Sequence, residues 1–215
     1  MFKVYPVRYN MRPGFFFRYL KKYLYIRHTA VMNIHFISPF SIDKNLGKAY
    51  NNTIKNLPIT DWVCVMDYDA MLLDPNQVKR MYEYIQAYPD ATLFVCYGSR
   101  VKDGVPQQYL FGRKEQVATI TDHINIARNL LAADNLSGAL NVKQVNRSVA
   151  GFLMLFSVET WRRFPFDEGR KCLTVDTNFS KRILRAGGKI LLMESIYVWH
   201  TYRLLEGKQS IKHLL

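Results

Sequence analysis

The chain has 215 residues, of which 49% are hydrophobic, and it carries a formal net charge of +13 at pH 7. This apolar share suits a sizeable core and excludes a disordered tail. The basic balance favours a polyanionic partner, namely nucleic acid, anionic lipid or a phosphorylated substrate, without choosing among them. No apolar run reaches the ~18 residues of a membrane-spanning helix, so we expect none.

The three cysteines are Cys64, Cys96 and Cys172. An odd number without a Cys-x-x-Cys pair argues against a disulfide framework and against a zinc site. A reducing compartment is the simpler expectation, and we expect a cytoplasmic protein.

Residues 1–31 contain seven lysines and arginines and no acidic residue. Within 14–27, apolar residues recur at helical spacing, which predicts a short basic amphipathic helix. Two readings stay open for this extension. The helix lies on an anionic membrane, which would make the protein peripheral on the inner face, or it covers an open side of the core.

The main domain is predicted to span 32–215. A strand is expected over 33–40, then a helix over 43–57 with Asp43 as its N-cap and Pro58 as its stop. An apolar strand follows and leads to Asp67 and Asp69. Another helix starts at Pro75, and a strand follows over 91–97. Strands that alternate with helices predict an α/β fold with a largely parallel sheet.

The stretch 98–147 is less regular and is read as a loop-rich insertion with a helix near 122–133. An apolar run over 149–156 and a helical turn over 158–164 come next. A helix over 176–186 ends at two glycines, and two short strands over 189–193 and 196–199 precede His200.

The acidic pair after the apolar strand is the most informative feature. Residues i and i+2 of a strand point the same way, so Asp67 and Asp69 are expected to face one point just past the strand end. Two such carboxylates repel each other unless a positive charge lies between them, and a hard divalent cation bridging to phosphate is the natural candidate. The alternative is a turn with solvated acids.

Five motifs in order carry a resemblance to a known family. They are the segment 45–51 (NLGKAYN), Asp67-Tyr68-Asp69, the segment 151–156 (GFLMLF), the segment 175–179 (VDTNF) and the segment 197–200 (YVWH). This order resembles the GT-A glycosyltransferases, most of all glycosyltransferase family 2 and its relatives. The resemblance covers 33–203 and implies a GT-A, Rossmann-like fold.

The resemblance also implies a nucleotide-sugar donor and a Mn²⁺ or Mg²⁺ ion. Asp69 would ligate the metal directly, Asp67 would bind metal or donor, and His200 would be a third ligand, which suits Mn²⁺ better than Mg²⁺. Asp176 matches the general base of inverting members, although the motif here is Val-Asp rather than the more frequent Glu-Asp. The alternatives are a surface or core histidine at 200 and a helix-capping role for Asp176.

Further donor contacts follow from the same resemblance. Gly151 would let backbone approach a sugar closely, or serve only turn geometry. The remaining candidates follow the first strand, where α/β sheets bind ligands, although for Asp43 a purely capping role is an equal alternative. They are Pro39, Phe40, Ser41, Asp43 and Asn45.

The leading hypothesis is a metal-dependent, inverting glycosyltransferase that acts on a glycan or lipid-linked acceptor in surface glycan or glycolipid synthesis. A sugar-phosphate nucleotidyltransferase would need a glycine-rich phosphate loop, which residues 41–45 do not supply. A nucleic-acid-binding module rests on charge alone and predicts salt-dependent binding to oligonucleotides through a basic stripe with exposed aromatic residues. The aromatic residues outside 1–31 mostly fall on expected core positions, so no nucleic-acid partner is expected. A non-catalytic relative with the same fold is also compatible with the sequence.

Overall fold

The computed structural model describes residues 32–99, 105–109, 119–169 and 174–201. By its internal contacts the chain divides into two units, Met1–Met32 and Asn33–Leu215. The basic extension and its expected helix over 14–27 lie outside the described residues, so both readings of that segment stay predictions. Within the described residues, no helix is long and apolar enough to cross a membrane.

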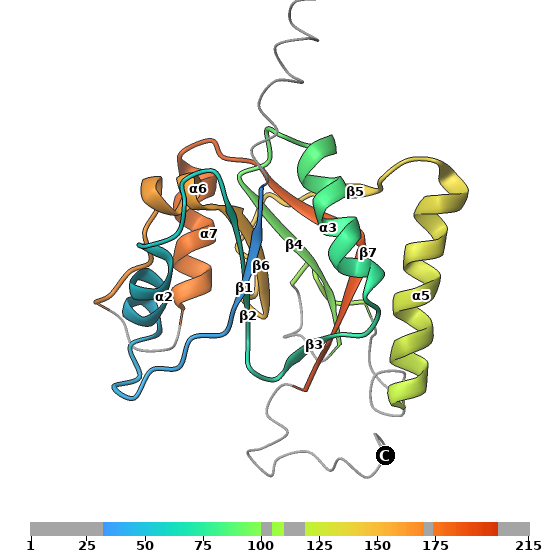
Figure 1. Ribbon diagram of the computed structural model, residues 1–215, viewed down its shortest axis with the longest axis horizontal. Helices are drawn as coiled ribbons and strands as arrows, with labels where there is room; N and C mark the ends of the chain where they lie inside the picture. The colour runs from blue at the N-terminus through green and yellow to red at the C-terminus, as the bar shows by residue number, and fades with distance from the viewer. Residues whose placement is uncertain (1–31, 100–104, 110–118, 170–173, 202–215) are drawn as a thin grey trace, which may run out of the picture. The chain divides into compact units, whose positions relative to one another are not determined.

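Helices cover both faces of a central sheet in the second unit (Figure 1). In that view α2, α6 and α7 lie on one side, and α3 and α5 lie on the other. The helices are α2 (Leu46–Ile54), α3 (Asn76–Ala87), α5 (Ile120–Ser137), α6 (Val158–Arg163) and α7 (Val175–Arg185).

Seven strands of the described residues form this sheet. The apolar run before the acidic pair is the buried strand that its sequence predicts, since Val63, Cys64 and Val65 are all 0% exposed. The strands are β1 (Ile34–Ile37), β2 (Trp62–Met66), β3 (Ala70–Leu72), β4 (Leu93–Gly98), β5 (Val142–Gln144), β6 (Leu153–Ser157) and β7 (Ile190–His200).

The sheet is mixed, which corrects the expectation of a largely parallel one. Its order is β1-β2-β6-β4-β7-β3, with β5 also on β7, and only the pairs β1/β2 and β4/β7 are parallel. A single helical crossover, such as α2 between β1 and β2, gives parallel neighbours. Strand β6 instead follows α5 and β5, and it enters between β2 and β4 in the opposite direction. The α/β class itself is confirmed.

One core cluster joins the sheet to the helices on the side of α2 and α7. Tyr50 and Ile54 of α2 and Phe179 of α7 pack in it with Val63 and Val65 of β2. The Phe179 ring lies 5.0 Å from that of Phe156 on β6. This packing fixes the start of α7, and therefore Asp176, against the sheet.

Two element boundaries differ from the sequence-based expectation. Helix α2 begins at Leu46 and its N-cap is Asn45, whose side chain accepts from the Lys48 N–H at 3.0 Å, so the assignment of the cap to Asp43 is wrong. Asp43 accepts instead from the Ser41 hydroxyl and the Asn45 N–H in the preceding turn.

The expected strands over 189–193 and 196–199 are one strand, β7, with a register shift opposite Cys96 and Tyr97. The polar pair Glu194-Ser195 interrupts the apolar pattern without ending the strand, because each side chain has a partner. The Tyr97 hydroxyl donates to Glu194 at 3.1 Å, and Ser195 lies 2.8 Å from the Tyr84 hydroxyl.

The described part of 98–147 is more regular than a loop-rich insertion. Helix α5 extends beyond the expected 122–133 because both of its ends are capped. Thr119 and Asp122 form a capping box at the start, and Gly138, with φ of 66°, ends the helix in the left-handed region.

Candidate metal centre and active site

The acidic pair lies in a tight turn between β2 and β3. Strand β2 ends at Met66, and the Asp67 N–H then donates to the Phe152 carbonyl at 3.1 Å. The Ala70 N–H closes the turn on the Asp67 carbonyl, also at 3.1 Å. The two carboxylates are therefore brought together by a turn, and not by the i, i+2 alternation of a continued strand.

His200 reaches both carboxylates from the last position of β7. Its Nε2 lies 3.4 Å from Asp69 Oδ1 and 3.7 Å from Asp67 Oδ2. Strand pairing places it there, because His200 lies opposite Ala70 in the antiparallel β3/β7 pair. The Thr201 N–H also donates to the Asp69 carbonyl at 3.0 Å. Residues 130 positions apart in sequence thus meet through a backbone ladder.

Two neighbours fix the imidazole of His200, which is 6% exposed. The Ser99 hydroxyl donates to the His200 carbonyl and accepts from the His200 N–H, at 3.1 Å and 2.9 Å. The Phe152 ring stacks on the imidazole with the ring centres 5.2 Å apart. Because Ser99 holds the backbone of His200 and Phe152 covers one face of its ring, the imidazole has little freedom to move away from the carboxylates.

The donor set fits a divalent cation. One ligand atom from each of Asp67, Asp69 and His200 lies within 4.8 Å of the others. Carboxylate oxygens suit Mg²⁺ and Mn²⁺, and the imidazole nitrogen shifts the preference towards Mn²⁺. The three predicted ligands are therefore adjacent in space and chemically matched to such an ion.

The electrostatics of Asp67 also favour a positive partner. Burial raises the pKa of its carboxyl to about 6, and the charges of Asp69 and Asp176 act in the same direction, while His200 lowers it. The side chain retains 37% exposure, so solvent moderates the effect of burial. Carboxylates that raise one another's pKa bind a cation with relief of repulsion.

Asp176 lies in the first turn of α7, close enough to Asp67 for their charges to interact. Its Oδ1 accepts from the Thr177 N–H at 2.7 Å, and the N-cap of the helix is Thr174 rather than Asp176. Burial raises the pKa of Asp176, and hydrogen bonding from the backbone of Thr177 and Gly151 partly offsets this. A half-buried carboxylate with a raised pKa is suited to accept a proton.

Gly151 packs directly against Asp176. A methyl group on its Cα would stand 2.7 Å from Asp176 Cβ and 3.3 Å from Oδ2. The close approach that the sequence led us to expect at this glycine is therefore made, within the chain itself, to Asp176. Contact with a sugar stays a prediction.

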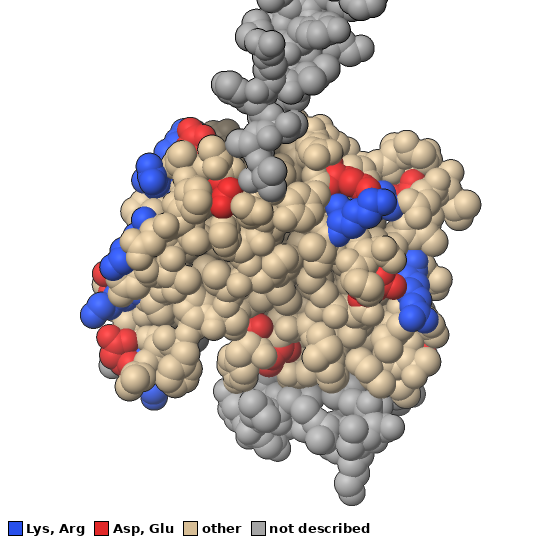
Figure 2. Space-filling view, in the orientation of Figure 1, with Lys and Arg blue, Asp and Glu red and all other residues tan. Residues whose placement is uncertain are grey.

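The donor-side candidates follow β1, next to the acidic turn. Ile37 lies opposite Val65 in the parallel β1/β2 pair, and Pro39 and Asp67 each follow two residues later. In Figure 2 the lower edge of the surface is notched between the segment after β1 and the turn after β2. Phe40, in the segment after β1, is 85% exposed.

The Asn45 amide has structural partners besides its capping role. Its Nδ2 donates to the Glu168 carbonyl at 2.8 Å, and nearby Gly47 packs so tightly that an added Cβ would stand 2.1 Å from the Asp167 carbonyl oxygen. This part of α2 therefore anchors the loop before α7. Donor contacts of Pro39, Phe40, Ser41, Asp43 and Asn45 stay predictions.

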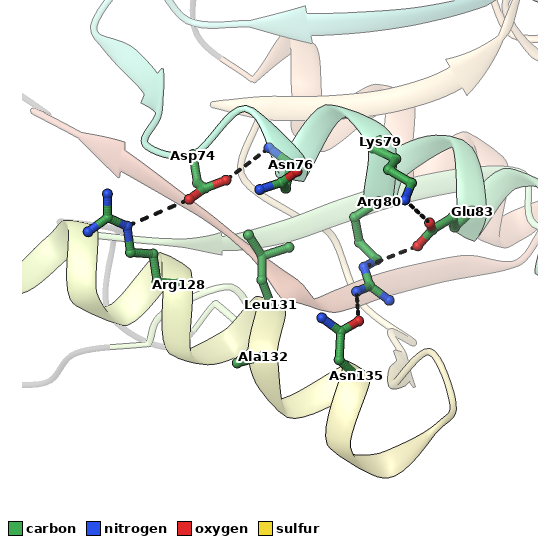
Figure 3. A pocket seen from close by; sticks show the side chains of 9 residues that line it. All are labelled: Asp74, Asn76, Lys79, Arg80, Glu83, Arg128, Leu131, Ala132 and Asn135. Atoms are coloured by element: carbon green, nitrogen blue, oxygen red, sulfur yellow. Dashed lines mark hydrogen bonds and ion pairs between the residues drawn. The ribbon is translucent and has the colours of Figure 1, made fainter.

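A separate groove of about 360 Å³ lies between α3 and α5 (Figure 3). It shares no residue with the carboxylate cluster, and its cations already have anionic partners. Arg80 pairs with Glu83 at 3.2 Å, and Arg128 with Asp74 at 3.7 Å. Among the described residues on the face in Figure 2, acidic side chains likewise lie among the basic ones instead of leaving a continuous basic stripe.

Sequence reasoning did not identify the supports of the site. Phe152 lies inside the segment 151–156, yet nothing in the sequence predicts its stack on His200. Ser99 lies at the start of the stretch 98–147, where the sequence has no periodic pattern, so nothing there predicts its hydrogen bonds with the backbone of His200. The sequence signal that pointed to this site is the order of the motifs along the chain alone. A strand that ends in two acids, a glycine and a late histidine follow one another in the order of the family that the chain resembles.

Comparison of the sequence with protein-family models and with curated proteins finds no match.

Proposed function

We propose that the protein is a metal-dependent glycosyltransferase of the GT-A fold, which moves a sugar from a nucleoside diphosphate to an acceptor hydroxyl with inversion. The observation that supports this most directly is the meeting of Asp67, Asp69 and His200, with Asp176 close enough to influence the charge on Asp67. One arrangement thereby offers a cation site for a diphosphate and a carboxylate for a proton. The acceptor, a glycan or lipid-linked hydroxyl, stays a prediction.

In this proposal Asp67, Asp69 and His200 hold the Mn²⁺ or Mg²⁺ ion. When bound, such an ion neutralises charge on the departing diphosphate. The chain's own supports for these ligands are the turn bond from Asp67 to Phe152 and the stack of Phe152 on His200. Fixed ligands reduce the reorganisation that binding requires.

Asp176 acts as the general base. The acceptor oxygen forms a bond to the anomeric carbon of the donor, and its proton passes to the Asp176 carboxylate. The bond from that carbon to the phosphate oxygen breaks, and its electron pair leaves with the nucleoside diphosphate. Burial makes the carboxylate a stronger base than a solvated one, because it raises its pKa.

A thermal-shift screen of nucleoside diphosphates, with and without Mn²⁺, tests the proposal. A ligand of the native state raises the Tm, so we expect stabilisation by at least one nucleotide that requires the metal. Asp69→Ala should abolish it. Asp90→Ala is the control, because Asp90 pairs with Lys189 on the surface. This pair lies next to the first residues of β4 and β7, whereas His200 is the last residue of β7.

Three results would contradict the proposal. One is nucleotide binding that does not need the metal, and another is metal-dependent binding that survives Asp69→Ala. The third is tight binding of oligonucleotides that weakens steeply with salt, which would favour a nucleic-acid-binding module.

A further inference from the structure

Residues 149–152, here called the bridge segment, connect the two halves of the candidate site. On the side of α7, the Val149 N–H donates to the Ser180 hydroxyl at 3.3 Å. Gly151 then packs against Asp176, one helical turn before Ser180. The position of the carboxylate is therefore coupled to the course of this backbone.

The other end of the bridge segment supports the cation ligands. The Phe152 carbonyl accepts from the Asp67 N–H at 3.1 Å, and the Phe152 ring stacks on the imidazole of His200. A displacement of the bridge segment would thus move the candidate base and two of the three candidate ligands relative to one another.

Gln107 binds the middle of the bridge segment through both ends of its amide. Its Oε1 accepts from the Ala150 N–H at 2.7 Å, and its Nε2 donates to the Ala150 carbonyl at 2.9 Å. Gln107 is 0% exposed, and its own carbonyl accepts from the Gly98 N–H at the end of β4 at 2.9 Å. The side chain therefore ties the bridge segment to the sheet as a neighbouring strand would.

We infer that Gln107 is a positioning residue, which sets Asp176 relative to the cation ligands by fixing Ala150. This inference rests on the proposed function. To bind both the N–H and the carbonyl of Ala150, a side chain must carry an acceptor and a donor side by side, as an amide does. Met has nearly the same length and offers neither, so Gln107→Met removes the tie with little change of shape.

Gln77 offers a matched control within the same chain. It is also 0% exposed, and its amide likewise binds only backbone groups. These belong to Leu73, Asp74 and Tyr197, which lie outside the bridge segment. Gln77→Met therefore removes a comparable buried clamp elsewhere, and a merely structural role for Gln107 predicts equal consequences for the two variants.

The first readout is the affinity for Mn²⁺ alone, measured from the free six-line electron paramagnetic resonance signal. At equal folded fraction, verified by urea unfolding, we expect Gln107→Met to bind Mn²⁺ about tenfold more weakly than wild type, as for other residues that orient metal ligands. Gln77→Met should bind like wild type. If wild type binds Mn²⁺, equal affinities in the two variants would overturn the inference.

The second readout is independent of the metal. The Phe152 ring stacks on His200, so its ring current shifts the imidazole proton signals of His200, which the spectrum of His200→Gln identifies. We expect Gln107→Met to move these signals and Gln77→Met to leave them in place. Unmoved signals in Gln107→Met would refute the positioning role.

Failure of the proposed function looks different. Wild type would then bind no Mn²⁺ and no nucleoside diphosphate, while the His200 signals still decide whether Gln107 positions the bridge segment. If a donor is found, its turnover adds a third readout. Misplacement of a base costs about 100-fold in kcat, so kcat of Gln107→Met should fall by that order, with the donor KM changing far less.

Discussion

Gly151 lies so close to Asp176 that a methyl group on its Cα would stand 2.7 Å from Asp176 Cβ. The glycine is needed for this contact and not for its backbone angles, because its φ is not among the positive values of the described residues. The absence of a side chain at one residue thus sets the place of the carboxylate at another.

Gly151→Ala should displace Asp176 and impair transfer while the fold persists. Overpacking of this kind costs about 1–3 kcal/mol of stability. We expect a lowered free energy of unfolding in urea and a larger fractional loss of kcat than of Mn²⁺ affinity. Gly169→Ala is the control, since Gly169 is exposed and, among the described residues, its new Cβ would meet only Asp167 Oδ1, at 3.3 Å. Wild-type kcat in Gly151→Ala would contradict the assignment of Asp176.

The affinity for Mn²⁺ should fall in acid. The pKa of Asp67 is raised to about 6, above its ordinary value of 3.8, so this carboxyl favours its proton in the metal-free native state. Its contribution to metal-free stability is therefore present below pH 3.8 and is lost as the pH rises through about 6.

Mn²⁺ has the opposite preference, because it must displace that proton. Its affinity should decline about tenfold per pH unit below the raised pKa and level off above it. Titrations with Mn²⁺ between about pH 5 and pH 8 measure this profile. An affinity that does not change across this interval would show that Asp67 is not a ligand.

Asp61→Asn should destabilise the native state near neutral pH. The carboxylate is 2% exposed, and it lies 2.7 Å from His35 Nε2 in a hydrogen bond between β1 and the residue before β2. The hydrogen bond with His35 lowers the pKa of Asp61. This stabilisation is present above pH 3.8 and is lost as the pH falls through the lowered pKa.

Urea unfolding as a function of pH tests this expectation. A weakened hydrogen bond to a charged group costs about 1.5–3 kcal/mol, and the difference between wild type and Asp61→Asn should narrow in acid. A difference that stays constant down to the acid limit would mean that the charge of Asp61 contributes nothing.

Gly47→Ala should destabilise α2 although alanine is the better helix former. Helix propensity alone predicts a gain of about 1 kcal/mol. Packing predicts the reverse, because the added Cβ would stand 2.1 Å from the carbonyl oxygen of Asp167, which is backbone and has little room to move. Asn52→Ala, at an exposed position of the same helix, gains propensity without the clash. An unfolding midpoint of Gly47→Ala above wild type would contradict the close packing.

The sequence predicted the α/β class and the buried strand before the acidic pair. These features depend on local pattern, since β2 is an apolar run and Gly187 ends α7 in a positive-φ turn. The nearness of His200 to Asp67 and Asp69 was predicted only by resemblance to a family order. No periodicity connects the start of β3 with the end of β7, and the geometry itself comes from their pairing.

The direction of β6 and the role of Gln107 could not be predicted. Strand direction is local information only where one helix joins neighbouring strands, and β6 has no such connection. Gln107 acts through two backbone groups of Ala150, and any residue has such groups, so its partner leaves no mark in the sequence. Contacts of this kind appear only once the chain is folded.

Strand β3 is the last strand of the sheet order and pairs, among the described residues, with β7 alone. Asp69 immediately precedes this short edge strand, and His200 belongs to its neighbour β7. An ion bound by both residues would therefore link the two strands. Occupancy should then slow deuterium uptake at the amides of Ala70–Leu72 more than at β1, the opposite border. The rate of local opening at this edge of the sheet would thereby show whether the cation is bound.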